Sequence, residues 1–432
     1  MLHLRNCRFV VTHDLATGTI KVLEEVDIKV REDGVVEKIG KNLRTESGYE
    51  VVDCRRYVVI PGLVNAHTHV AMTLLRGFCD DEEVCTWLQH MWGVERELTP
   101  EVVRLASELG IMEMLSTGTT AFIDMYYMPE QTAEVAERYG IRAALGPVFM
   151  DVMYSAKKVE NDLRNLVTMC RGMRYVRPIV NVHSIYTCTR ETLERARDLA
   201  SELNLNIQIH ISETRHEVYR CRKETGKFPI EYIAELGLVT ERTQLVHLGW
   251  VASWELGIIR DQGATVTHCP VSSMKLATAG FLPIKEMMSM GIRVTIGTDG
   301  AASNNTLDMF RELKAAVLLH RHGYWSTDIN AQHVFTAATV RGYELLNIKG
   351  GVIAPGYVAD LVLIDVEKAP LQPLRRDNVL STLVYCVCGR DVEMTMVSGK
   401  VVYWRKRDEE KWRERAMEIA NKLNKYMEKY LT

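Results

Sequence analysis

The chain has 432 residues, of which 47% are hydrophobic and 25% are charged, a composition that is typical of globular proteins and excludes a mainly disordered chain. Its 53 basic and 56 acidic residues give a formal net charge of −3, which supplies no general attraction to nucleic acid or to anionic membranes. The sequence has no uncharged apolar run of membrane-spanning length, no signal-peptide pattern and no CxxC pair among its ten cysteines. We therefore expect a cytoplasmic protein without a nucleic-acid or membrane partner.

Short β-rich runs separated by glycines and charged turns occupy the first part of the chain, residues 1–57. Similar runs return late in the sequence, at residues 359–365, 379–387 and 392–403. Because the two ends of the chain share this character, we predict a small discontinuous β-sandwich domain formed by residues 1–57 and 352–404. The segment between them is then an insertion with its own fold.

In residues 58–351, apolar strands alternate with stretches whose apolar residues recur every three or four positions, a pattern that indicates a parallel α/β fold. The predicted strands are residues 63–69, 119–125, 141–149, 175–183, 206–213, 244–249, 264–268 and 292–299. Eight such strands predict a (β/α)8 TIM barrel. The last segment, 405–432, has the pattern of an amphipathic helix with mixed charges, which we expect to dock on its own chain or on a neighbouring subunit of a homo-oligomer.

Catalytic side chains of such barrels come from the C-terminal ends of the strands. Six of the eight predicted strands carry a histidine or an acid there, namely His67 with His69, His183, His210 with Glu213, His247, His268 and Asp299. A single histidine at a strand end is most often a hydrogen-bonded core residue, but that interpretation does not explain why so many gather at one rim.

His67 and His69 stand two positions apart on one strand, so both imidazoles face the same side and can reach one ion. Imidazole and carboxylate suit a divalent first-row metal such as Zn²⁺. Two-metal hydrolases of this layout use a lysine near strand four, where this chain reads NVHS at 181–184. We therefore predict one divalent ion per chain, Zn²⁺ being favoured and Fe²⁺, Ni²⁺ and Mn²⁺ being alternatives.

Four motifs make the sequence familiar: PGLVNAHTH at 61–69, MTLLRG at 72–77, GTDGAASNN at 297–305 and GVIAPGYVADLVL at 351–363. With them the chain resembles the amidohydrolase superfamily, and within it the 5′-methylthioadenosine/S-adenosylhomocysteine deaminase group. The resemblance covers nearly the whole chain. It implies a metal-dependent hydrolase whose barrel is joined to a small β-domain.

The resemblance also implies roles for individual residues. The metal ligands would be His67, His69, His210 and Asp299, and the catalytic groups Glu213, Asp299 and His247. The substrate-binding residues would be Glu95 at the ribose hydroxyls, Trp87, His183, Glu213 and His268. In the implied reaction, water activated by the metal attacks C6 of an adenine ring, Glu213 protonates a ring nitrogen, and Asp299 takes the proton of the water for delivery to departing ammonia.

Other functions remain open at this point. Guanine or cytosine deamination and triazine hydrolysis would keep the metal and change the ring or the leaving group. A barrel that serves only as a scaffold is disfavoured, because the ligand set is complete.

The sequence departs from the resemblance in one respect that concerns the substrate. Members that act on S-adenosylhomocysteine place arginines after strand three to hold the amino-acid carboxylate, whereas residues 143–163 contain none. We therefore expect adenosine and 5′-methylthioadenosine to be preferred to S-adenosylhomocysteine. Lys157 and Lys158 could replace the missing clamp, although two solvated lysines at the start of a helix are the favoured interpretation.

Overall fold

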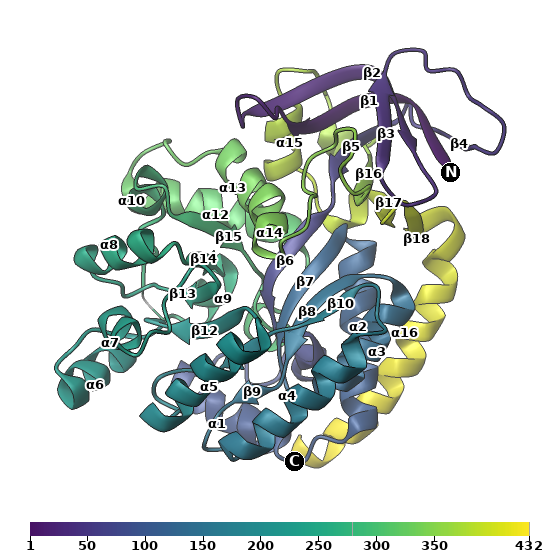
Figure 1. Cartoon of the computed structure of the whole chain (residues 1–432). Helices are drawn as coiled ribbons and strands as arrows, with labels where there is room; N and C mark the ends of the chain where they lie inside the picture. Colours follow the sequence, from purple (N-terminus) through teal and green to yellow (C-terminus); the bar gives the residue numbers. More distant parts are fainter. Residues whose placement is uncertain (279, 432) are drawn as a thin grey trace.

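The computed structural model describes residues 1–278 and 280–431. Its middle part is an α/β unit of parallel strands with helices around them, and a β-rich unit lies at the top of Figure 1, where the first and the late parts of the chain meet. The predicted fold class, a TIM-barrel-like α/β unit with a β-rich domain, is confirmed.

The eight predicted strand positions of the barrel are all present, and every pairing between them is parallel. The third and fourth positions are each split in two, the third at Pro147, which has no N–H to donate to a neighbouring strand. The strands are β6 (Leu63–Thr68), β7 (Thr119–Met125), β8 (Arg142–Gly146), β9 (Val148–Phe149), β10 (Val176–Pro178), β11 (Val180–Val182), β12 (Ile207–Ile211), β13 (Thr243–His247), β14 (Thr265–His268) and β15 (Arg293–Ile296).

Hydrogen bonds join these strands into two sheets, with the orders β10-β8-β7-β6 and β15-β14-β13-β12-β11-β9. The first and last strand positions meet at the C-terminal rim, where the Asp299 N–H donates to the His67 carbonyl oxygen at 2.9 Å. This contact brings the residues that follow β6 and β15 together.

Helices cover the outside of the strands, and two of them begin with an N-cap threonine: the Thr99 and Thr189 side chains accept the N–H groups of Val102 and Thr192. The outer helices are α2 (Pro100–Ser116), α3 (Pro129–Tyr139), α4 (Ala156–Cys170), α5 (Arg190–Leu203), α6 (Arg215–Thr225), α7 (Pro229–Glu235), α8 (Ser253–Gln262), α10 (Ile284–Ser289), α12 (Met309–Tyr324), α13 (Ala331–Ala338) and α14 (Val340–Leu345). Helices α1 (Val84–Glu95), α9 (Pro270–Lys275) and α11 (Ala301–Asn304) lie in loops that follow strand ends.

The β-rich domain joins the two ends of the chain, because β16 pairs antiparallel with β5 in the register Leu361 to Pro61. Its strands are β1 (Leu2–His13), β2 (Ile20–Val30), β3 (Val36–Gly40), β4 (Glu50–Asp53), β5 (Tyr57–Pro61), β16 (Leu361–Asp365), β17 (Val392–Val397) and β18 (Lys400–Trp404). All eight belong to one hydrogen-bonded sheet, which refines the sandwich expected from the sequence.

The β-like run expected at 379–387 is wrong, because this segment forms helix α15 (Val379–Tyr385). Its buried residues Val379, Thr382 and Leu383 recur at three and four positions and so share one helical face. The branched residues suggested a strand, but packing of this face against the neighbouring elements decides the conformation.

The predicted C-terminal amphipathic helix is α16 (Arg405–Met427), which runs down the right-hand side of Figure 1 beside α2 and α3. Its buried residues Ile419 and Leu423 pack into the cluster that α2 also lines. Arg415 adds an ion pair with Glu108 of α2, at 2.8 Å. The helix therefore docks on its own chain.

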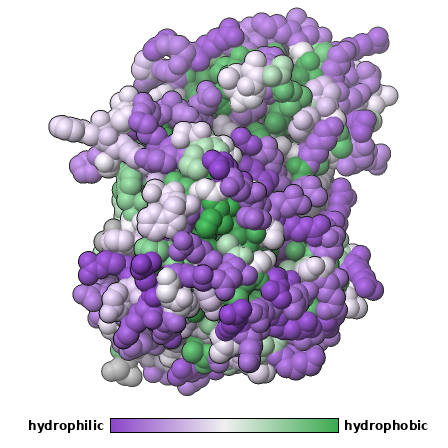
Figure 2. All heavy atoms as spheres, turned by 60° about the vertical axis from the view of Figure 1, so that its left-hand side comes forward, coloured by the Kyte–Doolittle hydropathy of each residue, from purple (hydrophilic) through white to green (hydrophobic). Residues whose placement is uncertain are grey.

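The face shown in Figure 2 is covered mainly by hydrophilic side chains, with smaller hydrophobic areas between them. Among the residues that the structure describes, no helix combines the length and the apolar character needed to cross a membrane.

Candidate active site

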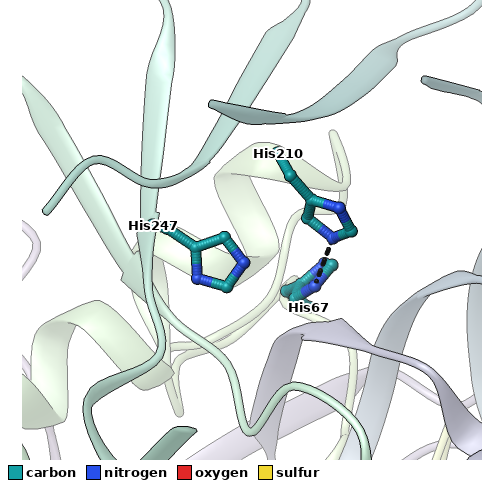
Figure 3. A group of neighbouring side chains, drawn as sticks. All are labelled: His67, His210 and His247. Atoms are coloured by element: carbon teal, nitrogen blue, oxygen red, sulfur yellow. Dashed lines mark hydrogen bonds between the residues drawn. The ribbon is translucent and has the colours of Figure 1, made fainter. Parts of the chain in front are cut away.

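Histidines from three strands meet at the C-terminal rim of the barrel. His67 lies in β6, His210 in β12 and His247 at the end of β13, and Figure 3 shows their imidazole rings side by side. The Nε2 atoms of His67 and His210 are 3.1 Å apart. Asp299 approaches from the loop after β15, with its Oδ1 at 3.1 Å from His69 Nε2 and 3.6 Å from His67 Nε2.

This cluster fits a divalent metal ion. The possible ligand atoms of His67, His69 and Asp299 lie within 4.8 Å of one another, as do those of His67, His210 and His247. The Nδ1 atoms of His67 and His69 are hydrogen-bonded to Gln208 Oε1 and to the Met125 carbonyl oxygen, so the Nε2 atom of each ring faces the cluster and is the one that can bind an ion. Three imidazoles and a carboxylate form a donor set that suits Zn²⁺ and related ions.

Residues behind the cluster hold its members in place. Gln208 donates from Nε2 to Asn181 Oδ1 at 3.1 Å, and Asn181 Nδ2 in turn donates to the carbonyl oxygens of Asp124 and Gly146. On the other side, the Ser272 hydroxyl donates to Asp299 Oδ2 at 2.5 Å. Such outer contacts fix the orientation of ligands and of their lone pairs.

The Asp299 side chain is a carboxylate at neutral pH. Burial alone would raise its pKa, but the hydrogen bonds with His67 and His69 hold the pKa of Asp299 well below its usual range. The Asp299 carboxylate can therefore bind a metal cation or accept a proton.

A pocket of about 660 Å³ opens on the cluster and contains His69, His210, His247 and Asp299 in its wall. Helix α1 supplies much of the remaining wall, including Trp87, Trp92 and Glu95, and the loop after β7 supplies Tyr126 and Tyr127. The pocket is thus largely aromatic and apolar, with a few polar groups that converge near the metal-binding cluster, which is the usual character of a small-molecule site.

Glu213 lies in this pocket with Oε1 at 3.8 Å from His247 Nε2. Burial, followed by the negative charges of Asp299 and Glu217, raises the pKa of Glu213 to about 8. The side chain is consequently a protonated acid at neutral pH and can donate a proton to a bound molecule.

Three other predicted substrate contacts also line the pocket. Glu95 is buried, accepts a hydrogen bond from the Tyr126 hydroxyl at 2.8 Å, and has its pKa raised to about 7 by burial. The Trp87 indole N–H is buried without a hydrogen-bond partner among the described residues, so it is free to donate to a ligand. Burial lowers the pKa of His183 to about 3, which keeps this imidazole neutral.

A profile of the amidohydrolase family matches residues 58–402. The chain belongs to the amidohydrolase family. The resemblance inferred from the four motifs is therefore confirmed.

Two curated relatives and one solved structure show which amidohydrolases this chain is similar to. A Pyrococcus furiosus protein named 5-methylthioadenosine/S-adenosylhomocysteine deaminase is 38% identical over 378 residues, 86% of this chain and 89% of the relative. A Methanosarcina mazei 5′-deoxyadenosine deaminase is 35% identical over 426 residues, covering 96% of each chain. The crystal structure of an adenosine deaminase from Xanthomonas campestris with bound zinc superposes with a TM-score of 0.91, at 31% identity and 98% coverage of both chains.

The amidohydrolase structure does not bring His268 to the pocket. Its Nε2 lies 3.1 Å from Nε2 of His320 on α12, and its ring lines a separate cavity on which His247 also lies. A position at a strand end does not fix which way a ring turns, and here the ring meets the helix that covers the strand. The predicted contact of His268 with the substrate has no support in this geometry.

The motifs and strand ends of the sequence did not predict several residues that line the pocket, among them Tyr126, Tyr127 and Trp92. The two tyrosines directly follow β7, so the same strand-end rule would have found them had it been applied to aromatic hydroxyls as well as to metal ligands. Trp92 lies on α1, far in the sequence from any strand end, and no pattern in the sequence singles it out.

Proposed function

We propose that this amidohydrolase catalyses the hydrolytic deamination of adenine nucleosides, giving the inosine analogue and ammonia. The observation that carries the proposal is the presence, in one pocket, of a metal-binding cluster and of Glu213, an acid that stays protonated at neutral pH. The names of the two relatives, which this chain matches over most of their length, support the same reaction.

The ion that the proposal requires is a single divalent metal held by His67, His69, His210 and Asp299, with Zn²⁺ favoured. When bound, such an ion supplies Lewis-acid activation of water at neutral pH. The zinc in the Xanthomonas campestris adenosine deaminase, which is 31% identical to this chain, supports the choice.

The chain's own residues then move the protons. As the water oxygen adds to C6 of the purine, Glu213 gives its proton to N1, and the Asp299 carboxylate accepts a proton from the water. That proton goes to the exocyclic nitrogen, the C6–N bond breaks and ammonia leaves. The proton that remains on the C6 oxygen goes to the Glu213 carboxylate, which restores the acid. His247, 3.8 Å from Glu213, is placed to hydrogen-bond the attacking oxygen. Positioned acid and base groups of this kind typically contribute on the order of 10²- to 10⁴-fold each.

The sugar is proposed to lie between Glu95, Trp87 and His183. A buried carboxyl group, an unpaired indole N–H and a neutral imidazole supply acceptors and donors that ribose hydroxyls can satisfy. This polar set favours a nucleoside over a free base.

We further propose that the preferred nucleosides have an uncharged 5′ substituent, as adenosine and 5′-methylthioadenosine do. Among the residues that the structure describes, none that lines the pocket is a lysine or an arginine. Lys157 and Lys158 pair with Glu160 and Asp162 of their own helix, at 3.5 and 2.6 Å, and their side chains are 74% and 55% exposed. This supports the interpretation of both lysines as solvated residues at the start of α4.

The test is a steady-state panel on the purified, metal-supplemented protein. The panel contains adenosine, 5′-methylthioadenosine, guanine, cytosine and a chlorinated triazine, with ammonia or chloride release as the readout. We expect the two adenine nucleosides to give the highest kcat/KM. A higher value for guanine, cytosine or the triazine would establish one of the alternative amidohydrolase reactions, and no turnover by a fully metallated protein would favour a scaffold.

A further inference from the structure

The residue that carries the proposed acid function sits on an unusual turn. Strand β12 ends at Ile211, and Ser212, directly before Glu213, has φ = +52°, in the left-handed region that residues with a side chain seldom adopt. The turn lets the chain leave the strand and start α6 at Arg215 within a few residues. Such a conformation persists only when the surroundings hold it.

Glu217, in the first turn of α6, holds this turn from the side. Its carboxyl group accepts the Ser212 N–H at Oε1 and the Glu213 N–H at Oε2, both at 2.9 Å, and the residue is only 2% exposed. The Glu217 N–H is bound in turn by the hydroxyl of Thr214, the N-cap residue. Both carboxyl oxygens are therefore used, and the side chain has one geometry that satisfies them.

The arrangement differs from an ordinary capping box. There, the glutamate in the third helical position accepts the backbone N–H of the N-cap residue itself. Here, the glutamate reaches past the N-cap to the two residues before it, one of which is Glu213. These hydrogen bonds fix the backbone of Glu213, and they also give partners to N–H groups that precede helix α6.

We propose that Glu217 is a positioning residue, which sets the place of the Glu213 carboxyl group in the pocket through the two backbone amides that it binds. The inference rests on the proposed function, because it assigns Glu217 to the acid of that reaction. Glu217 does not line the pocket, so it acts on a bound molecule only through Glu213. A misplacement of a catalytic group by about 1 Å can cost about 10²-fold in rate.

The chain offers a matched control in Glu255. This glutamate is also the third residue of a helix, α8, is 0% exposed, and accepts two backbone N–H groups, those of Ala252 and Ile230, both at 2.8 Å. Neither donor belongs to a residue that lines the pocket. Glu217 and Glu255 thus share burial, position in a helix and type of partner, and differ in whether a partner is the proposed acid.

The experiment compares Glu217→Gln with Glu255→Gln. Each change keeps the size of the side chain but turns one acceptor into a donor that faces a backbone N–H. We expect similar losses in melting temperature and an unchanged metal content in both variants. Glu217→Gln should lower kcat on adenosine by about 10- to 100-fold with KM within about 2-fold of wild type, whereas Glu255→Gln should keep kcat within about 2-fold.

Equal values of kcat for the two variants would overturn the proposal, because Glu217 would then contribute only to stability. If Glu217→Gln does not fold, Glu217→Asp provides the second test, since the shorter side chain keeps the charge but reaches one amide less well. Its kcat should fall below that of the wild type, by less than the roughly 10- to 100-fold expected for Glu217→Gln.

Crystal structures separate this inference from the proposed function. Absence of turnover in the wild type would refute the deaminase, yet the position of Glu213 can still be compared. A displaced Glu213 carboxyl group in Glu217→Gln, with Glu255→Gln like wild type, supports the positioning role. An undisplaced carboxyl group in Glu217→Gln contradicts it.

Discussion

Replacing the 5′-methylthio group of the substrate by homocysteine should lower kcat/KM. The change adds a carboxylate and an ammonium group to a molecule that, on the proposed function, binds in a pocket lined by residues such as Trp87, Met91 and Val148. No lysine or arginine in the described part of the chain lines this pocket, so the carboxylate loses water without gaining a cationic partner. A hydrogen bond to a charged group is worth about 1.5–3 kcal/mol, which corresponds to roughly 10- to 150-fold in kcat/KM.

The assay follows the ultraviolet change from the adenine to the hypoxanthine ring for adenosine, 5′-methylthioadenosine and S-adenosylhomocysteine under the same conditions. A second series uses the double variant Lys157→Ala/Lys158→Ala. Because both lysines pair with acids of α4 and point to solvent, the order of the three substrates should stay the same in this variant.

The opposite result would refute the reasoning. If S-adenosylhomocysteine had a clear advantage in the wild type and lost it in the double variant, the lysines would be the missing clamp. The pocket would then accept a charged 5′ group, contrary to its lining.

Three further predictions concern the metal, the acid and the C-terminal helix. His69→Ala should lose the ion in elemental analysis while His216→Ala, an exposed histidine on α6, retains it, and two ions per wild-type chain would contradict the single site. Glu213→Gln should keep its metal and lose about 10²- to 10⁴-fold in kcat, and near-normal turnover would show that another group moves the proton. Arg415→Ala should lower the free energy of unfolding at neutral pH by about 1.5–3 kcal/mol, unlike Arg413→Ala, whose partner Glu410 is exposed. Burial alone would raise the pKa of Glu108, but the hydrogen bonds from Arg415 and Tyr139 bring this pKa below its ordinary value. The stabilisation by Arg415 is therefore present above about pH 4.3 and is lost as the pH falls through the lowered pKa. A difference in stability between the two variants that persists in acid would contradict this prediction.

Much of the fold and of the site could be predicted because both depend on local periodicity. Strands that are apolar along their whole length and alternate with helical patterns imply a parallel barrel, and the barrel in turn places residues that follow strands at one rim. His67, His210 and Asp299 are far apart in the sequence and meet for this reason. Trp87 and Glu95 required the resemblance to a known family, since α1 lies in a loop whose path no period determines.

The features that escaped prediction depend on packing between elements. The segment now in α15 has residues common in strands, and only its tertiary contacts make it helical. His268 ends a strand as expected, but its ring turns to His320. Glu217 looks like an ordinary capping residue of α6, and the two amides that it binds become visible only when the turn at Ser212 is known.

The most direct test of the proposed reaction is the turnover of adenosine in water labelled with heavy oxygen. Hydrolytic deamination predicts inosine with one labelled oxygen at C6 and one ammonia released for each inosine formed, and this activity should disappear when the metal is removed and return when Zn²⁺ is added. Unchanged adenosine in the presence of fully metallated protein, or a product without the label, would contradict the account.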